Sequence, residues 1–437
     1  MKVVSKQDFY KIFPQKFLRK LKESLVPFGQ INKKEILDNL YNEIVTYTYH
    51  PQSPREYIVF NKHNFVARIV PTFTAKDYCL YYFATKILED EIAENRVEGT
   101  YGGWRLGNKI RLIEEAEELF IEQYVINSFN PGQWIKYWTE FQRKAWLYSR
   151  QYKYMLMFDI ANFYDSINLE LLKRKIYLVA PKSKHFYIEL LFHFLFNWNK
   201  ILEGYSQKTI GIPQDEIGDS SRLLANFYLQ DYDQKMKKLC EQNSVQYLRF
   251  ADDQILYGNN PQILRKLLFE ASKELFKIGL SINSSKVKEF NRETFNVYWT
   301  FEMFEMLRSG KIESVNKAIR QFISLKEKGI EFREYSVLKK ILNFPLLRKI
   351  DPNLKYRLFS IFLDKTFLSD ITYWHWNKMY RLFPEETKHE LLKNLDELVD
   401  EVHFNSFHYN LIKFYDKNSI AYNKDRLNNR INSLKIF

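Results

Sequence analysis

The sequence predicts an α+β fold in which an antiparallel sheet with packed helices is followed by an all-α C-terminal domain. Between residues 151 and 300, short runs rich in β-branched and aromatic residues alternate with longer segments of helical periodicity. Beyond them, apolar residues recur only at the spacing of amphipathic helices. A length of 437 residues allows two or three domains. We therefore divide the chain into residues 1–150, 151–305 and 306–437.

A hairpin is the clearest feature of the first region. Two β-rich runs, Tyr57–Phe60 and Phe65–Val70, flank a turn at residues 61–64. Lys62 in the turn and Arg68 in the second run add two positive charges. By themselves these charges indicate only the solvated surface of an exposed hairpin.

The third region predicts a succession of amphipathic helices. One begins with Ser314 as the expected N-cap and ends at Gly329. Its apolar stripe consists of Val315, Ala318, Ile319, Phe322 and Ile323. Another follows Pro384, with a stripe of Leu391, Leu392, Leu395, Leu398, Val399 and Val402. Such a series favours a helical bundle or a HEAT-like solenoid, although no repeat of fixed period supports the solenoid.

The composition favours a basic, reduced and soluble protein. The net charge of +13 and the pI near 9.2 indicate a polyanionic partner, because Lys and Arg that neutralise phosphates release counterions. With 36 Phe and 30 Tyr, some rings could stack on unpaired bases, but most belong in the core. Cys79 and Cys240 match no zinc or redox spacing. Because we find neither a signal peptide nor an apolar run of about 18 residues, we expect a cytoplasmic protein without a membrane partner.

Three aspartates in the second region are the candidates for chemistry. The apolar run Tyr154–Phe158 ends abruptly at Asp159. About ninety residues later, two β-rich runs flank Asp252 and Asp253, which places two adjacent carboxylates at the tip of a hairpin. Carboxylates from separate strands that meet at one point can hold the two cations of a phosphoryl-transfer site. Hard oxygen ligands suit Mg²⁺, with Mn²⁺ as the alternative. An isolated Asp-Asp pair by itself indicates only a solvated turn, and a chain of this length contains one by chance roughly as often as not.

The order of the surrounding motifs resembles the palm of reverse transcriptases. Motifs A, B, C and D of that family are matched, in this order, by residues 159–167, 211–214 with 221–226, 250–253 and 279–286. This resemblance implies a right-hand polymerase with fingers and palm, in which the C-terminal helices replace the usual thumb. It also implies an RNA-directed DNA polymerase that binds dNTPs and RNA or DNA.

The resemblance assigns a role to each candidate residue. Asp159 and Asp252 would bridge the metals, Asp253 would support the second metal, and the carbonyl of Ile160 would be a further ligand. Lys286, in motif D, would reach the triphosphate and protonate the leaving pyrophosphate. Each of these residue types also occurs in purely structural positions, and a lysine after a strand is usually just solvated.

Four further residues would bind the incoming nucleotide. In such enzymes basic residues of a fingers hairpin hold the triphosphate, and Lys62 and Arg68 match them. Gln214, in motif B, would contact the same nucleotide. Tyr164 falls where the family places an aromatic ring beneath the sugar, and a ring there would exclude a 2′-hydroxyl. Phe163 beside it is the better candidate for the core.

The chain departs from the family in motif B. The family usually has Gly after Pro-Gln, but this chain has Asp215 and Glu216, with Gly218 and Asp219 following. We expect these carboxylates to repel the phosphates of a template. Thr100–Arg105, in contrast, matches the family's segment between fingers and palm.

Among relatives, the motifs most resemble bacterial abortive-infection and other defence-associated reverse transcriptases, with retron-like palm motifs. This implies DNA synthesis in anti-phage defence, either copying RNA or adding nucleotides without a template. A homo-oligomer or a partner defence protein fits that branch. The alternatives are a retron-type enzyme that copies a dedicated non-coding RNA and, in another class, a non-catalytic RNA-binding protein with a polymerase fold. A metal-dependent nuclease would not need Tyr164, Gln214 or Lys286 at these places.

Overall fold

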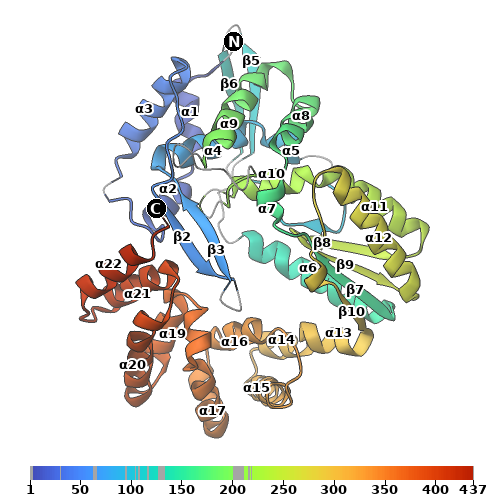
Figure 1. Ribbon diagram of the computed structural model, residues 1–437, viewed down its shortest axis with the longest axis vertical. Coiled ribbons are helices and arrows are strands. Elements are labelled where there is room, and N and C mark those ends of the chain that lie inside the picture. The colour runs from blue at the N-terminus through green and yellow to red at the C-terminus, as the bar shows by residue number, and fades with distance from the viewer. Residues whose placement is uncertain are drawn as a thin grey trace. The chain divides into compact units, whose positions relative to one another are not determined.

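The computed structural model describes residues 3–29, 31–62, 66–93, 96–103, 105–106, 109–115, 118–125, 133–199, 211–214, 217 and 219–436. By its internal contacts the chain forms two compact units (Figure 1). Unit 1 comprises Met1–Glu56 and Pro71–Arg292, and unit 2 comprises Tyr57–Val70 and Glu293–Phe437. The expected α+β composition, a sheet together with many helices, is confirmed. These two units do not test the predicted division of the chain into three regions, which stays a prediction.

The main sheet of unit 1 has five strands in the order β10-β7-β9-β8-β4. They are β4 (Thr100–Tyr101), β7 (Tyr154–Asp159), β8 (Gln246–Phe250), β9 (Asp253–Gly258) and β10 (Lys288–Asn291). The pairings are antiparallel except that of β4 with β8, which is parallel. The apolar runs on both sides of the three candidate aspartates are therefore the three central strands, as expected from their β-branched and aromatic composition.

Helices cover this sheet on both faces (Figure 1). They are α6 (Gln133–Gln151), α11 (Gln230–Gln242) and α12 (Pro261–Lys277). Successive side chains of a strand point to opposite faces. Accordingly, Leu256 belongs to the core cluster that includes Leu264 and Leu267 of α12, while the ring centroid of Tyr257 lies 5.5 Å from that of Tyr148 on α6.

The rest of unit 1 is mainly helical. Its other α-helices are α1 (Lys6–Ile12), α2 (Gln15–Lys22), α3 (Lys33–Val45), α4 (Ala75–Ile87), α5 (Glu89–Ala93), α7 (Phe163–Ser166), α8 (Leu169–Val179), α9 (His185–Asn197) and α10 (Ser220–Tyr228). Helix α4 is buried at every position from Asp77 to Ile87, and it packs against α9. The thiols of Cys79, on α4, and Cys240 are free and buried.

A second sheet of unit 1 was not expected from the sequence. It joins β1 (Val3–Val4), β5 (Lys109–Glu115) and β6 (Glu118–Val125), in which β5 and β6 pair antiparallel and β1 pairs parallel with β6. Both longer strands carry several charged residues, and no Gly, Pro or Asn stands between them. The turn residues that usually mark a hairpin are therefore missing from the sequence.

Unit 2 contains a hairpin and a series of helices. The helices are α13 (Arg292–Trp299), α14 (Phe301–Arg308), α15 (Ile312–Glu327), α16 (Glu334–Leu342), α17 (Pro352–Phe362), α18 (Lys365–Ser369), α19 (Tyr373–Leu382), α20 (Glu385–Glu401), α21 (Asn405–Asn418) and α22 (Lys424–Ser433). All of the α15 stripe and most of the α20 stripe are buried in one core. The prediction that Ser314 is the N-cap is wrong, because α15 begins earlier, with Lys311 as its N-cap. The Ser309 hydroxyl accepts a hydrogen bond from the Lys311 N–H and so closes the turn before the helix.

The expected hairpin is formed by β2 (Glu56–Asn61) and β3 (Ala67–Thr72). The side chain of Asn405, on α21, replaces a missing strand at β2. Its Oδ1 accepts the Val59 N–H at 2.7 Å, and its Nδ2 donates to the Tyr57 carbonyl at 2.9 Å. Asn405 is fully buried. The Asn405 amide and the packing of Val59 in the core of the C-terminal helices join the hairpin to unit 2.

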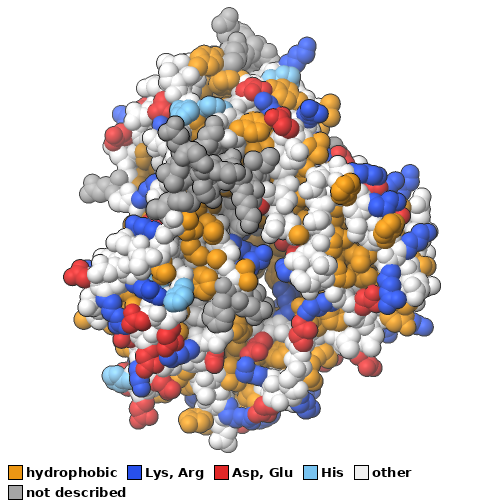
Figure 2. Space-filling model, in the orientation of Figure 1, with side chains coloured by type: hydrophobic (Ala, Val, Ile, Leu, Met, Phe, Trp, Pro, Cys, Tyr) orange, Lys and Arg blue, Asp and Glu red, His pale blue; other side chains and the backbone are white. Residues whose placement is uncertain are grey.

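Most aromatic side chains of the described residues are buried, as expected. Exceptions on α12 are Phe269, which is 63% exposed, and Phe276, which is 82% exposed. Figure 2 shows hydrophobic side chains, with Lys and Arg around them, on the part of unit 1 that carries α11 and α12. In the described part of the chain, no helix combines the length and the apolar character needed to cross a membrane.

We predict that Asn405→Ala destabilises unit 2 by about 3 kcal/mol, because it leaves a buried N–H and a buried carbonyl of β2 without partners. Urea unfolding and amide hydrogen exchange at Val59 would measure the effect. Asn432→Ala, at an exposed position on α22, is the matched control and should change neither quantity. Unchanged protection of Val59 in Asn405→Ala would contradict this account of the hairpin.

Candidate active site

The three aspartates lie at the same end of the main sheet. Asp159 is the last residue of β7, and in the register of the sheet it lies opposite Asp253, the first residue of β9. Asp252 lies in the turn between β8 and β9, next to Ala251. Asp159 is 5% exposed, Asp252 is half-buried and Asp253 is exposed. The pairing of β7 with β9 therefore brings Asp159, at the expected strand end, next to the hairpin tip that carries Asp252 and Asp253.

The turn that carries Asp252 is held from outside. Ala251 has a φ of +54°, a left-handed conformation that costs a residue with a Cβ about 1 to 2 kcal/mol. Both of its backbone groups are bound: its N–H donates to the Tyr101 carbonyl at 3.0 Å, and its carbonyl accepts from Arg249 Nη1 at 2.8 Å. These two bonds fix the peptide immediately before Asp252.

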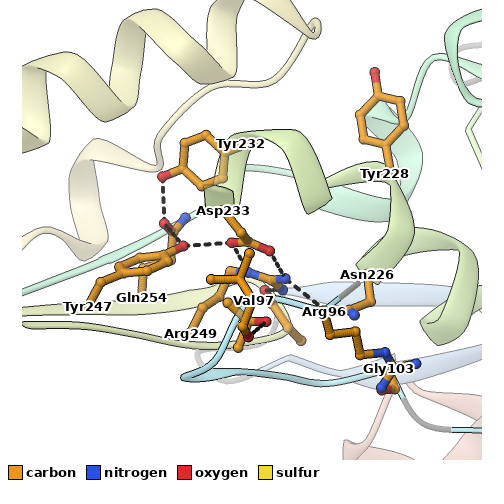
Figure 3. A network of polar contacts seen from close by, with 12 residues as sticks. Arg96, Val97, Gly103, Asn226, Tyr228, Tyr232, Asp233, Tyr247, Arg249 and Gln254 are labelled. Carbon is orange, nitrogen blue, oxygen red and sulfur yellow. Dashed lines mark hydrogen bonds and ion pairs between the residues drawn. The ribbon is translucent and has the colours of Figure 1, made fainter. Parts of the chain in front are cut away.

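Arg249 is the centre of a buried polar network (Figure 3). It is fully buried, and its guanidinium binds both carboxylate oxygens of Asp233, on α11, with Nε to Oδ1 at 2.7 Å. Its Nη2 also donates to Asn226 Oδ1, on α10, at 2.9 Å. Burial alone would lower the pKa of Arg249, but the charge and hydrogen bonds of Asp233 raise that pKa above its ordinary value. Arg249 therefore stays charged and ties two helices to the turn before Asp252.

Two tyrosines complete this network (Figure 3). The Tyr247 hydroxyl lies 2.9 Å from Asp233 Oδ1 and 3.0 Å from Gln254 Oε1, and the Tyr232 hydroxyl donates to the same Gln254 oxygen at 2.6 Å. Gln254 follows Asp253 on β9, so the strand after the turn is held as well as the strand before it. The network thus fixes both sides of the hairpin that carries the two aspartates.

Two glycines let another segment reach the turn. A Cβ on Gly102, which has a φ of +114°, would lie 2.5 Å from the Ala251 nitrogen. A Cβ on Gly103 would lie 2.5 Å from Asn226 Cβ and 2.9 Å from the Arg222 carbonyl oxygen. Only residues without a side chain fit between α10 and the turn. Gly102 and Gly103 belong to Thr100–Arg105, the segment that resembles the family's region between fingers and palm. These two glycines therefore allow that segment to support the Asp252 turn.

Lys286 reaches Asp159 through a second short pairing. Ile160 and Ile282 form an isolated antiparallel bridge, in which the Ala161 N–H binds the Ser281 carbonyl and the Asn283 N–H binds the Asp159 carbonyl. Those two hydrogen bonds use the groups on either side of Ile160 and do not take its carbonyl oxygen. The pairing delivers Lys286, whose Nζ lies 2.7 Å from Asp159 Oδ2.

The charges of the site shift two pKa values in the same direction. Partial burial would lower the pKa of Lys286, but the hydrogen bond to Asp159 and the charges of the three aspartates raise it. Lys286 is therefore an ammonium at neutral pH. The pKa of Asp252 lies well above its ordinary value, because burial, the charges of Asp253 and Asp159, and a hydrogen bond to Asp159 all disfavour its ionised form. The site holds more negative charge than Lys286 can neutralise.

This site has the donors for a divalent cation but is not a complete protein cage. Oδ1 of Asp159 is buried and has no hydrogen-bond partner among the described residues. Such an orphaned acceptor in a cluster of carboxylates fits a hard cation. Within the described ranges, no three His, Cys, Asp or Glu side chains converge as a metal site. Mg²⁺ usually takes one or two carboxylates and completes its shell with water and phosphate oxygens, so the carboxylates present fit that cation.

Tyr164 lies beside motif B. Asn162, with a φ of +44°, turns the chain into the short helix α7, which buries Phe163 and leaves Tyr164 half-buried. The Tyr164 carbonyl accepts the Ile212 N–H at 3.1 Å. A Cβ on Gly211 would lie 2.1 Å from the same carbonyl oxygen. Gly211 therefore permits the close contact between motifs A and B, and Phe163 is the core residue of the pair, as expected.

Motif B is described only in part. Gln214 is half-buried and follows Pro213, whose carbonyl accepts a hydrogen bond from Ser221. Asp215, Glu216 and Gly218 lie outside the described residues. Asp219 is 2% exposed and pairs with Arg222, so its charge is balanced within the chain, and repulsion of a template by these acids stays a prediction.

The two fingers residues lie in the other unit. Lys62 and Arg68 belong to the β2-β3 hairpin, where the Lys62 N–H closes the turn by donating to the Val66 carbonyl at 2.7 Å. Both Arg68 and Lys62 are exposed. Their triphosphate-binding role stays a prediction.

Sequence reasoning missed Arg249, Asp233 and the partnership of Asn226 with them. One signal was present: Arg249 stands inside the apolar run Tyr247–Phe250, and a charge in a central strand needs a buried partner. The partner itself was not deducible, because Asp233 is one of several acids in an amphipathic helix.

Comparisons with known proteins agree on one family. A family model described as reverse transcriptase (RNA-dependent DNA polymerase) matches residues 98–328, more than half of the chain. The retron Ec83 reverse transcriptase of Escherichia coli is 27% identical over 157 residues, which cover 34% of this chain and 48% of that protein. The chain thus spans about half the length of the curated relative that it matches.

Two solved structures of apo telomerase from Candida Tropicalis also resemble the chain. The form truncated from its C-terminal domain has a TM-score of 0.36 at 16% identity and covers 59% of this chain and 55% of that chain. The other has a TM-score of 0.37 at 13% identity and covers 92% of this chain and 66% of that chain. These scores are too low to support an argument.

We predict that Gly103→Ala destabilises unit 1 by about 1 to 3 kcal/mol, because the new Cβ meets the Asn226 Cβ and a backbone carbonyl of α10, neither of which can move alone. Denaturant unfolding would measure the loss. Gly258→Ala is the matched control, because its Cβ would meet mainly the flexible end of Leu264 at 2.9 Å. Equal losses in both variants would show that the Gly103 contact is not special.

Proposed function

Because this chain belongs to the reverse transcriptase (RNA-dependent DNA polymerase) family, we propose that it adds deoxynucleotides to a growing DNA strand on an RNA template. The observation that carries this proposal is the orphaned buried oxygen of Asp159, which lies opposite Asp253 and next to the Asp252 turn that Arg249 and the Tyr101 carbonyl hold in place. A solvated Asp-Asp turn would need none of this support.

Asp159 and Asp252 are the metal-binding carboxylates of the proposed reaction, with Asp253 and the Ile160 carbonyl as further ligands. Mg²⁺, or Mn²⁺ in its place, would neutralise the charge that develops on the phosphoryl group. The raised pKa of Asp252 supports this assignment, because burial and the charges of Asp253 and Asp159 disfavour its ionised form, and a bound cation would offset that cost. The mutual repulsion of these acids also disfavours the alternative of a non-catalytic RNA-binding protein.

Lys286 serves the triphosphate in the proposed reaction. Its raised pKa keeps a proton on the amine, and that proton is available to the leaving pyrophosphate. In this structure the ammonium lies on Asp159 Oδ2. Lys286 would be free to reach a phosphate oxygen if Asp159 held a divalent cation in place of the ammonium. Lys62, Arg68 and Gln214 are proposed to hold the rest of the nucleotide.

The retron-type alternative is favoured over template-independent synthesis. The match to a retron enzyme over 157 residues supports it, and the burial of Asp219 removes one of the three charges that argued against a template. We propose a retron-type enzyme that copies a dedicated non-coding RNA in the cytoplasm, in anti-phage defence. The test is to incubate the purified protein with labelled dNTPs and Mg²⁺, with and without RNA, and to digest the product with DNase or protease. Equal synthesis without RNA would contradict the templated reaction.

We predict that Asp252→Asn combined with Asp253→Asn lowers nucleotide incorporation at least about a thousandfold, because the metal ligands supply several kcal/mol of transition-state stabilisation. The assay is incorporation of labelled dNTP in Mg²⁺, and thermal unfolding confirms the fold. Asp231→Asn, an exposed acid on α11, is the matched control and should retain activity. Polymerisation that survives the double change would sink the assignment.

We predict that Tyr164→Val relaxes the discrimination against ribonucleotides by roughly tenfold or more, because it removes the ring expected beneath the sugar. The measurement is the ratio of kcat/KM for each dNTP to that for the matching NTP. Tyr154→Ala, at an exposed position on β7, serves as control. An unchanged ratio in Tyr164→Val would place the steric gate elsewhere.

A further inference from the structure

Three basic side chains of unit 2 lie together on two packed helices. Lys339 lies in the last turn of α16, and Lys378 and His375 lie one turn apart on α19, which packs on α16. Neither Lys339 nor Lys378 forms an ion pair with a carboxylate in the described part of the chain. In the lower part of the face in Figure 2, Lys and Arg lie among Asp and Glu. We call Lys339, Lys378 and His375 the basic cluster.

The cluster is held together by a specific contact. Lys378 Nζ donates to Oδ1 of Asn343, the C-cap of α16, which lies four residues after Lys339 and so on the same face of that helix. The contact brings the Lys378 ammonium toward Lys339.

The pKa values of the cluster agree with this geometry. Burial lowers the pKa of Lys378, and it lowers that of Lys339 despite the charge of Asp370, the acid that acts on it. Burial and the charges of Lys339 and Lys378 lower the pKa of His375 to about 4. An anion at the cluster would offset the two like charges that contribute to the lowered pKa of His375.

His375 is set to donate a hydrogen bond. Its Nδ1 lies 3.4 Å from the Thr372 N–H and 3.1 Å from the Thr372 hydroxyl. Because the N–H can only donate, Nδ1 accepts, and the proton of the neutral ring sits on Nε2. The cluster therefore offers one neutral N–H donor and two ammonium groups, a donor set that suits phosphate oxygens.

An exposed indole lies beside the cluster. Trp374 is 45% exposed, and Lys378, four residues later on α19, lies over its ring at 4.1 Å from the centroid. Its neighbour Tyr373 is flanked by Lys413 and Lys417 of α21, at 5.7 and 5.6 Å from the ring centroid. Aromatic rings interleaved with cations are the arrangement that stacks unpaired bases and follows their phosphates.

We propose that the surface formed by the basic cluster and Trp374 binds a single-stranded nucleic acid, with phosphates on the cluster and an unpaired base on the indole. This site is separate from the three aspartates, and it depends on the proposed function only for the class of its partner. A duplex hides its base faces, so the exposed indole favours a single strand.

The test measures binding of a fluorescent single-stranded RNA of about twenty nucleotides to the full chain, without dNTPs or metal, by anisotropy over a range of salt. Trp374→Ala should weaken binding about tenfold, because stacking of one base is lost. Lys339→Gln and Lys378→Gln should each lower the slope of log Kd against log salt by about 0.7. Tyr356→Ala, 80% exposed on α17, and Lys393→Gln, exposed on α20, are the matched controls.

Parallel arms separate the alternatives. A DNA strand of the same sequence should depend on Trp374 in the same way, whereas an RNA duplex should not. NMR titration of His375 supplies a readout that a structural role would not move: its pKa should rise when the RNA is bound. Trp374→Phe, which keeps a ring, should retain most of the affinity if Trp374→Ala fails to fold.

Two outcomes would overturn the inference. One is affinity and salt slope unchanged in all three variants relative to the controls. The other is a polyglutamate peptide that binds as tightly as RNA and depends on Trp374, which would make the surface a docking site for acidic protein. If the chain incorporates dNTPs but these variants bind RNA normally, only this inference fails. If it binds RNA through Trp374 but incorporates nothing, only the proposed function fails.

Discussion

The ion pair of Arg249 with Asp233 is the interaction on which the site depends. It buries a guanidinium and a carboxylate completely, and such burial is tolerated only when every hydrogen bond is made. Here the guanidinium binds Asp233, Asn226 and the Ala251 carbonyl together. Removing one partner of a buried pair typically costs about 3 to 5 kcal/mol. The network therefore forms as a whole, and α10, α11 and the Asp252 turn take up their positions together.

This constraint explains how the fold tolerates three neighbouring acids. Their repulsion opposes folding, and Lys286 offsets only part of it. The left-handed Ala251 adds local strain to the same turn. Strain of this kind persists where the surroundings over-determine the conformation. The buried pair, the β4 carbonyl and the close contact of Gly102 supply those surroundings, so the acids stay close although their charges oppose it.

Local patterns predicted the elements well and their long-range partners poorly. The composition predicted the strand that ends at Asp159 and the two strands that flank Asp252. It also predicted the apolar stripes of α15 and α20, because periodicity depends only on residues that are close in sequence. The β5-β6 hairpin escaped notice because no turn residue marks it. The pairing of Asp219 with Arg222 was local and could have been inferred from their three-residue spacing in a helix start. The partners of Arg249 could not be inferred in this way, because Asp233 and Asn226 lie 16 and 23 residues away and leave no local pattern.

The amide of Asn405 on the edge of β2 joins residues 346 positions apart. Closing so long a loop carries an entropy cost that local contacts do not repay, so this pairing belongs to a late stage of folding. During synthesis the hairpin leaves the ribosome before the helix that completes it. Its polar edge meanwhile stays open to water or to a chaperone, whereas the strands around Asp159 and Asp252 already have their neighbours. The aspartate-bearing sheet is thus able to form before the C-terminal helices secure the hairpin.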